Sequence, residues 1–160
     1  MNTDIQTTVA GELNTFLVNK GYHSIPFIKN AVGYLLVDIT INGVKGAFIL
    51  DTGASATIVD TKQANRLQLV LQTDEATFQG AGAGGQGMEV IPSKGNSIEI
   101  GSYQLNDYPL LVMSLFAHVT EVFEQAGVHE ELSGLLGVDI LIPGKAVIDY
   151  GSMMLYILPH

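Results

Sequence analysis

Cysteine and tryptophan are absent from the 160 residues, and Lys and Arg together number only 7 against 16 Asp and Glu. Without cysteine the chain has no disulfide framework, no thiolate nucleophile and no cysteine-based zinc site. The formal charge of -9 lacks the basic surface typical of nucleic-acid-binding proteins. We therefore expect no nucleic-acid partner.

Long hydrophobic runs are also missing. No stretch reaches the roughly 20 apolar residues that span a bilayer. Residues 1–20 do not combine a basic start with an apolar run, so they do not resemble a signal peptide. We expect no membrane segment in this chain. The compartment itself stays unknown, with the cytoplasm as the default expectation.

The composition that is present, 47% hydrophobic and 14% charged residues, is typical of one globular domain. We expect a single domain over residues 1–160, with an N-terminal extension at 1–24 and a core at 25–158. Apolar residues at helical spacing predict a helix over 9–20, with Thr8 as its N-cap and Gly21 as its stop.

Short β-like runs dominate the rest of the chain and predict a mainly β, barrel-like fold with two or three short helices. The expected strands are 25–28, 34–41, 47–50, 88–91, 97–100, 108–113, 146–149 and 153–158. Asn42 and Gly43 tolerate positive φ, so they predict a tight hairpin turn.

Two further helices are expected after the first one. Asp60 and Gln63 have the spacing of a capping pair before Ala64. Ser114 precedes an amphipathic run at 115–126, with Gly127 as its stop.

The segment most informative about chemistry is an apolar strand that ends at Asp51, followed by Thr52, Gly53, Ala54 and Ser55. A carboxylate at the end of a buried strand is costly unless hydrogen bonds compensate it, and the small residues leave room for backbone N–H groups to approach. The simpler interpretation of the tripeptide alone is an ordinary Asx turn.

A second apolar element, Leu135-Leu136-Gly137, follows later and precedes the strand pair at 146–158. With these features in this order, the chain resembles the retropepsin-like aspartic proteases over residues 25–158. The resemblance also includes a glycine-rich hairpin from Phe78 to Val90 and the closing Val147-Ile148-Asp149-Tyr150. The combination is far more specific than Asp-Thr-Gly alone.

The resemblance implies a closed β-barrel with a flap hairpin, in which Asp51 is the catalytic residue. The residues that support the catalytic loop are then Thr52, Gly53, Ala54, Leu135, Leu136 and Gly137. The two leucines are expected to pack beneath the loop. No metal or cofactor is implied.

The resemblance further implies a homodimer that acts on a peptide or protein substrate, because one Asp-Thr-Gly loop supplies only half of a catalytic pair. By this resemblance, the two copies of Asp51 share one proton, as the paired carboxylates of aspartic proteases do. One then acts as general base and the other as general acid on a water. Ala54 stands where pepsin-like enzymes have a serine donor, so we expect activity that reaches toward neutral pH.

The glycine run at 80–87 has two interpretations. Its spacing matches a dinucleotide fingerprint, but the residues that follow indicate a strand instead of the required helix. A flap over the substrate is favoured, with arms at 76–78 and 88–91. The flap and substrate-binding residues are then Phe78, Gly80, Gly82, Gly84, Gly85 and Met88.

Other polar residues carry weaker signals. His118 and Glu121 share a helical spacing, with His129 and Glu130 beyond, but no third ligand completes a metal site. Asp139 and Asp149 are interpreted as local cap or turn residues. An alternative function keeps the fold without the reaction, as an inactive dimerisation or peptide-binding module.

Overall fold

The computed structural model describes residues 3–73, 78–80 and 88–160. The helices are α1 (Thr3–Asn19), the single 3-10 turn η1 (Thr61–Gln63), α2 (Thr120–Gln125) and α3 (Val138–Leu141). The strands are β1 (His23–Pro26), β2 (Ile28–Lys29), β3 (Leu35–Ile41), β4 (Val44–Leu50), β5 (Ile58–Asp60), β6 (Phe78–Gly80), β7 (Met88–Ile100), β8 (Tyr103–Met113), β9 (Leu132–Leu136), β10 (Val147–Asp149) and β11 (Met154–Ile157).

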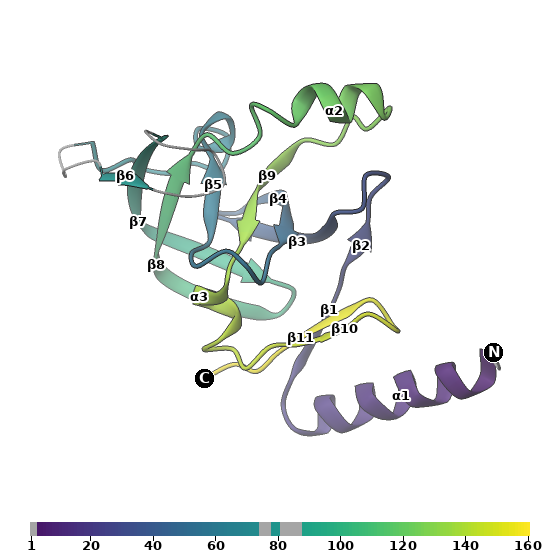
Figure 1. Ribbon diagram of the computed structural model, residues 1–160. Coiled ribbons are helices and arrows are strands. Elements are labelled where there is room, and N and C mark those ends of the chain that lie inside the picture. Colours follow the sequence, from purple (N-terminus) through teal and green to yellow (C-terminus); the bar gives the residue numbers. More distant parts are fainter. Residues whose placement is uncertain (1–2, 74–77, 81–87) are drawn as a thin grey trace.

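A closed barrel forms the body of the molecule (Figure 1). Its strands are hydrogen-bonded in the order β3-β4-β9-β5-β8-β7, and β7 closes the ring by pairing with β3. Thr40 lies opposite Glu99 and Ile41 opposite Ile98 at this closure. The expected mainly β barrel is thus confirmed.

The turn at Asn42 and Gly43 connects β3 to β4 as predicted. Both residues have positive φ, 50° and 81°, which is the backbone conformation that a tight two-residue hairpin requires. The paired strands then run from this turn so that β4 delivers the chain to Asp51.

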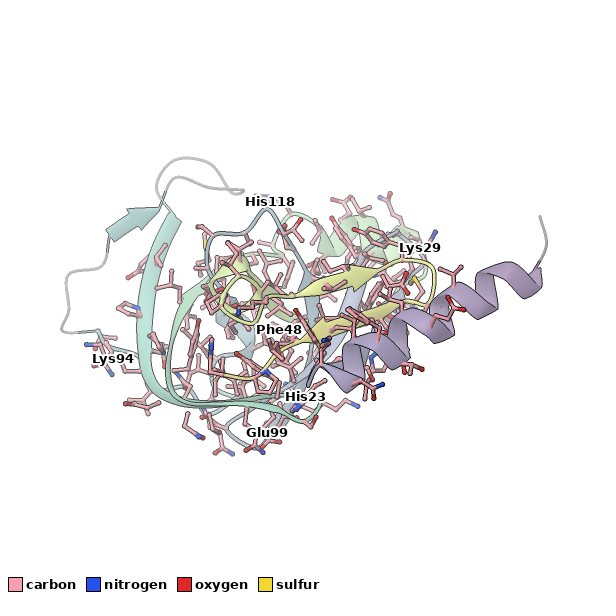
Figure 2. All side chains as sticks on the ribbon, turned by 90° about the horizontal axis from the view of Figure 1, so that it is seen from below. His23, Lys29, Phe48, Lys94, Glu99 and His118 are labelled. Carbon is pink, nitrogen blue, oxygen red and sulfur yellow. The ribbon has the colours of Figure 1, made fainter. Side chains whose placement is uncertain are left out.

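Phe48 belongs to the barrel core, and its fully buried side chain lies inside the ring of strands in Figure 2. Two glycines on neighbouring positions make room for its ring. A Cβ atom at Gly46 would lie 3.2 Å from Phe48 Cε2, and one at Gly134 would lie 2.7 Å from Phe48 Cε1. Large and small residues therefore interdigitate across β4 and β9.

Strand β7 is longer than expected, because it continues from Met88 to Ile100 without the predicted interruption after 91. Its pairing with β8 shifts register between Ser93 and Asn96, and Gly95 has a positive φ of 76°. Such irregularities allow β7 to continue through Pro92 and Gly95, two residue types that normally interrupt a strand. Strand β8 likewise begins at Tyr103 instead of 108.

A separate antiparallel sheet, β1-β11-β10, combines strands from the two ends of the chain. Helix α1 lies beside this sheet in Figures 1 and 2. Its contacts include the buried Leu17 and a hydrogen bond from Asn14 Nδ2 to the Tyr156 hydroxyl, 3.1 Å long. The helix begins at Thr3, so Thr8 lies within it and is not the predicted N-cap, whereas Gly21 follows its end as expected.

The predicted helix at 115–126 is shorter in the structure, where α2 begins at Thr120. The cause is Asp60, whose Oδ1 accepts hydrogen bonds from the Leu115 and Phe116 N–H groups and so ties this segment to the end of β5. Asp60 also caps η1 through Lys62 N–H, but Gln63 faces Arg66 and Ser133 and does not complete a capping box.

Helix α2 covers the outward face of the barrel through a second apolar cluster. Phe123 packs there with Leu36, Ile49, Val128 and Leu132. None of the helices among the described residues is long and apolar enough to cross a membrane.

Gly134→Ala tests the tight packing of the barrel. The new Cβ would overlap the Ile58 carbonyl oxygen, so strands β9 and β5 must move apart. We expect urea denaturation to show a loss of at least about 2 kcal/mol in the free energy of unfolding.

The matched control is Gly11→Ala in α1, where a Cβ meets nothing within 4 Å. This exposed helical position should gain about 0.5–1 kcal/mol. An unchanged urea midpoint for Gly134→Ala would contradict the packing described here.

Candidate active site

Asp51 lies directly beyond the end of β4, with its side chain half-buried. Its backbone N–H donates to the Leu136 carbonyl at 3.0 Å, which continues the pairing of β4 with β9 past the end of the strand. The Gly53 N–H donates to Asp51 Oδ1 at 2.9 Å. Backbone groups thus hold both the main chain and one carboxylate oxygen of this residue.

The loop that follows Asp51 crosses the turn between β9 and α3 at very short range. The Val138 N–H donates to the Ala54 carbonyl at 2.9 Å. A Cβ atom at Gly137 would lie 2.5 Å from the Ala56 carbonyl oxygen and 2.8 Å from that of Ala54. Gly137 is therefore required by the close approach of two backbones, since its own φ of -103° suits any residue.

A polar network lies under this crossing, in which Thr57 is buried and Tyr108 and Asp139 are half-buried. The Gly137 N–H donates to Thr57 Oγ1 at 3.1 Å, and the Thr57 hydroxyl donates to Asp139 Oδ1 at 2.8 Å. The Tyr108 hydroxyl donates to Asp139 Oδ2 at 3.0 Å. Both oxygens of Asp139 are thus engaged, and the network joins β8, the segment before β5 and α3.

Asp139 does more than the local cap or turn residue that the sequence predicted. It lies in the first turn of α3, but the hydrogen bonds to Thr57 and Tyr108 connect it to segments remote in the sequence. A carboxylate spaced for a helix start gives no signal of such partners. Asp149, by contrast, is a turn residue as predicted, since Gly151 N–H and the Ser152 hydroxyl donate to it.

Burial and the adjacent Asp139 carboxylate raise the pKa of the Tyr108 hydroxyl well above its ordinary value. The neutral phenol is favoured because it is removed from water and donates its proton to a carboxylate. At neutral pH this hydroxyl is therefore a hydrogen-bond donor and remains protonated.

The two leucines before Gly137 face opposite ways, which corrects the expectation that both pack beneath the loop. Leu136 is fully buried in the barrel core, and its carbonyl receives the Asp51 N–H. Leu135 is half-buried against the second apolar cluster, on the outward face with Ile49 and Phe123. Adjacent strand residues alternate in this way.

Strands β6 and β7 are the paired arms of a hairpin at the expected flap position. Phe78 lies opposite Val90, and Gly80 lies opposite Met88. The arms extend over 78–80 and from 88 onward, and residues 76 and 77 of the predicted first arm fall outside the described residues. Gly82, Gly84 and Gly85 fall outside the described residues. Because Met88 opens a strand, the glycine run is not followed by the helix that a dinucleotide site requires.

The histidines lie outside the 51–57 loop in the sequence. His118 precedes α2, and Glu121 lies within it. Within the described part of the chain, no group of three or more His, Asp or Glu side chains is arranged to hold a metal ion.

Tyr108→Phe tests the network beneath the loop through its pH dependence. A raised folded-state pKa means that this hydroxyl stabilises the fold fully below the ordinary value of 10.0, and that the stabilisation is lost as pH rises through the folded-state pKa. We expect the wild-type free energy of unfolding to fall between about pH 9 and 12, and Tyr108→Phe to fall less steeply.

Urea denaturation at each pH provides the measurement. Tyr150→Phe removes the hydroxyl of a residue that is 66% exposed and should keep the wild-type slope. Equal slopes for wild type and Tyr108→Phe would show that this hydroxyl is not held as described. Tyr103, whose pKa burial also raises, accounts for a residual slope in both.

A family model described as aspartyl protease matches residues 37–140, which include Asp51 and the crossing at Gly137. No curated protein matches the chain significantly.

Solved structures share the fold. A retropepsin-like aspartic protease from Rickettsia conorii is 21% identical, with a TM-score of 0.53, and the match covers 86% of this chain and 90% of that one. The retroviral protease-like domain of Ddi1 from Leishmania major is 19% identical, with a TM-score of 0.53 and coverage of 78% and 87%. These likenesses identify a retropepsin-like fold, and with the family match over most of the chain they show that it belongs to the aspartyl protease family.

Proposed function

We propose that this protein is an aspartic endopeptidase in which two copies of Asp51, one from each protomer of a homodimer, activate a water to hydrolyse a peptide bond. The observation that carries the proposal is the position of Asp51 itself. The carboxylate stands at the end of a rigid strand, half-buried, on a loop that backbone hydrogen bonds fix from two sides.

The geometry suits general acid and base chemistry. Only Gly53 N–H, among the described residues, donates to the Asp51 carboxylate, so its other oxygen is left for water or for a second carboxylate. Two such carboxylates close together share one proton, so one accepts a proton from water while the other donates to the carbonyl oxygen. No covalent intermediate is needed.

A surface beside Asp51 supports pairing with a second copy. A groove of about 320 Å³ adjoins Thr52; its apolar walls include Ile142, Ala146 and Ile148, and Lys145 also lines it. Ile142 is 69% exposed, which is unusual for a large apolar side chain in a groove. A two-fold axis near Thr52 would bury this groove against its own copy and bring the two Asp51 loops together.

The edge of β10 adds backbone hydrogen bonds to this surface. β10 pairs with β11 on one side, and its other edge has no strand partner in the described ranges 3–73, 78–80 and 88–160. Antiparallel pairing of β10 with the same strand of a second copy would satisfy these groups. The flap arms β6 and β7 would then supply one cover for the substrate from each protomer.

Asp51→Asn tests the chemistry. The amide keeps the shape of the side chain but cannot cycle between protonation states, so we expect peptide cleavage to fall by about 10²- to 10⁴-fold. Mass spectrometry of a diverse peptide mixture, at several pH values between about 4 and 7, measures the cuts and the residues around them.

Asp38→Asn makes the same chemical change at an exposed β3 side chain that pairs with Lys45, and it should leave cleavage unaltered. Undiminished cleavage by Asp51→Asn would refute the assignment of Asp51. Absence of cleavage by the dimeric wild type across this pH range would instead favour the inactive binding module.

Ile142→Glu tests the dimer. Because the interface is symmetric, the dimer would bury one new carboxylate from each protomer. We therefore expect the dimer dissociation constant to rise by at least about tenfold, and cleavage at low protein concentration to fall with it. Sedimentation velocity over a concentration series measures the dissociation constant.

Val70→Glu changes an apolar side chain that is 67% exposed and does not line the groove, so it is the matched control. Identical sedimentation of Ile142→Glu and wild type, with both dimeric, would exclude this groove as the interface.

A further inference from the structure

A second cavity, of about 360 Å³, lies between α2 and the end of β5. It is separate from the Asp51 loop, because the two places lie at opposite ends of β9. Leu132 at the start of β9 lines the cavity, whereas Leu136 at its other end receives the Asp51 N–H. At about 3.3 Å per residue, these two positions are roughly 13 Å apart.

The floor of this cavity is apolar and already formed. Phe123, Val128 and Leu132 are each at least nine-tenths buried, and Phe116 and Val119 pack against them. Tyr34 fixes Phe123 further by an edge contact, with ring centroids 5.7 Å apart. The size lies at the lower end of the range for ligand pockets. It suits one long side chain better than a large cofactor.

The polar wall of the cavity is strongly acidic. Its carboxylates are Asp60, Glu124, Glu130 and Glu131, and its basic side chains are Lys62 and His129. Asp60 is 4% exposed and accepts three backbone N–H groups, from Lys62, Leu115 and Phe116. A carboxylate has about four acceptor positions, so Asp60 keeps capacity for one further donor.

A metal ion is not the occupant that this arrangement favours. Asn30 Nδ2 already donates to Glu130 Oε2 at 3.2 Å, and no three acidic or histidine side chains of the described residues are placed as a ligand set. The complementary group is instead an organic cation with an apolar stem. Among natural side chains arginine fits best, since its guanidinium stacks on aromatic rings and donates to several carboxylate oxygens at once.

We propose that this cavity is a binding site for an arginine side chain of a polypeptide partner. The aliphatic stem would pack on Phe116 and Phe123, and the guanidinium would reach the Asp60 carboxylate and the rim glutamates. Attraction from a chain of formal charge -9 would assist the approach of a basic segment. The site does not depend on the chemistry proposed for Asp51.

The test uses the full chain carrying Asp51→Asn, so that no probe is hydrolysed. Acetyl-Ala-Ala-Arg-Ala-Ala-amide is titrated while backbone amide signals are followed by NMR. We expect the signals of Val119 and Phe123 to shift. The citrulline peptide, which has the same shape without the charge, should bind at least about fivefold more weakly.

Charge-neutral variants of the rim then separate this site from general attraction. Glu124→Gln and Glu131→Gln should each weaken binding by about two- to fivefold. Glu121→Gln makes the same change on the same helix, at an exposed residue that does not line the cavity, and should leave the affinity unaltered.

Three results would overturn the proposal. Equal losses in Glu121→Gln and Glu124→Gln would reveal unspecific charge attraction. Equal affinity for the citrulline peptide would show that the positive charge does not contribute to binding and that only apolar packing does. Failure of the arginine peptide to shift any signal near α2 at millimolar concentration, with the protein folded, would remove the site altogether.

Discussion

The crossing of the Asp51 loop over Gly137 is the contact on which the rest of the site depends. Two backbones meet there with no space for a Cβ atom, and the Val138 and Asp51 N–H groups donate across the junction. Because main-chain groups supply these bonds, the position of the carboxylate is coupled to the strands of the barrel and not to mobile side chains. The acid can therefore be precisely placed while its own oxygens stay largely uncommitted.

The network under the crossing converts this contact into a connection across the barrel. Asp139 accepts hydrogen bonds from Thr57 and Tyr108, which lie on segments far from it in the sequence. Asp139 is half-buried, so its carboxylate has lost part of its hydration, and a hydroxyl donor to each oxygen offsets this cost. The donors that stabilise Asp139 are thus separate from the one that holds Asp51, and the two acids experience different surroundings within one loop region.

The features that the sequence predicts are mainly local. The Asn42-Gly43 turn and the strand that leads to Asp51 follow from neighbouring residues, and the closed barrel follows from the short β-like runs together with the family resemblance. The hydrogen bonds of Asp139 are not predictable in this way, because its partners are remote in the sequence. Helix α2 begins later than its amphipathic pattern predicts, because the Asp60 side chain takes up the Leu115 and Phe116 N–H groups. Such tertiary competition has no signature in periodicity.

The sheet β1-β11-β10 has a consequence for the order in which the protein folds. β1 covers residues 23–26 and β11 covers residues 154–157, so the pairing of β1 requires a strand that lies far along the sequence. Pairing between such distant segments is slow, because the entropy of closing a long loop is lost before any hydrogen bond between the strands forms. Since β10 belongs to the same sheet, the surface we assign to the second copy matures last. Folding of the barrel would thus precede the formation of the surface through which we propose that two copies pair.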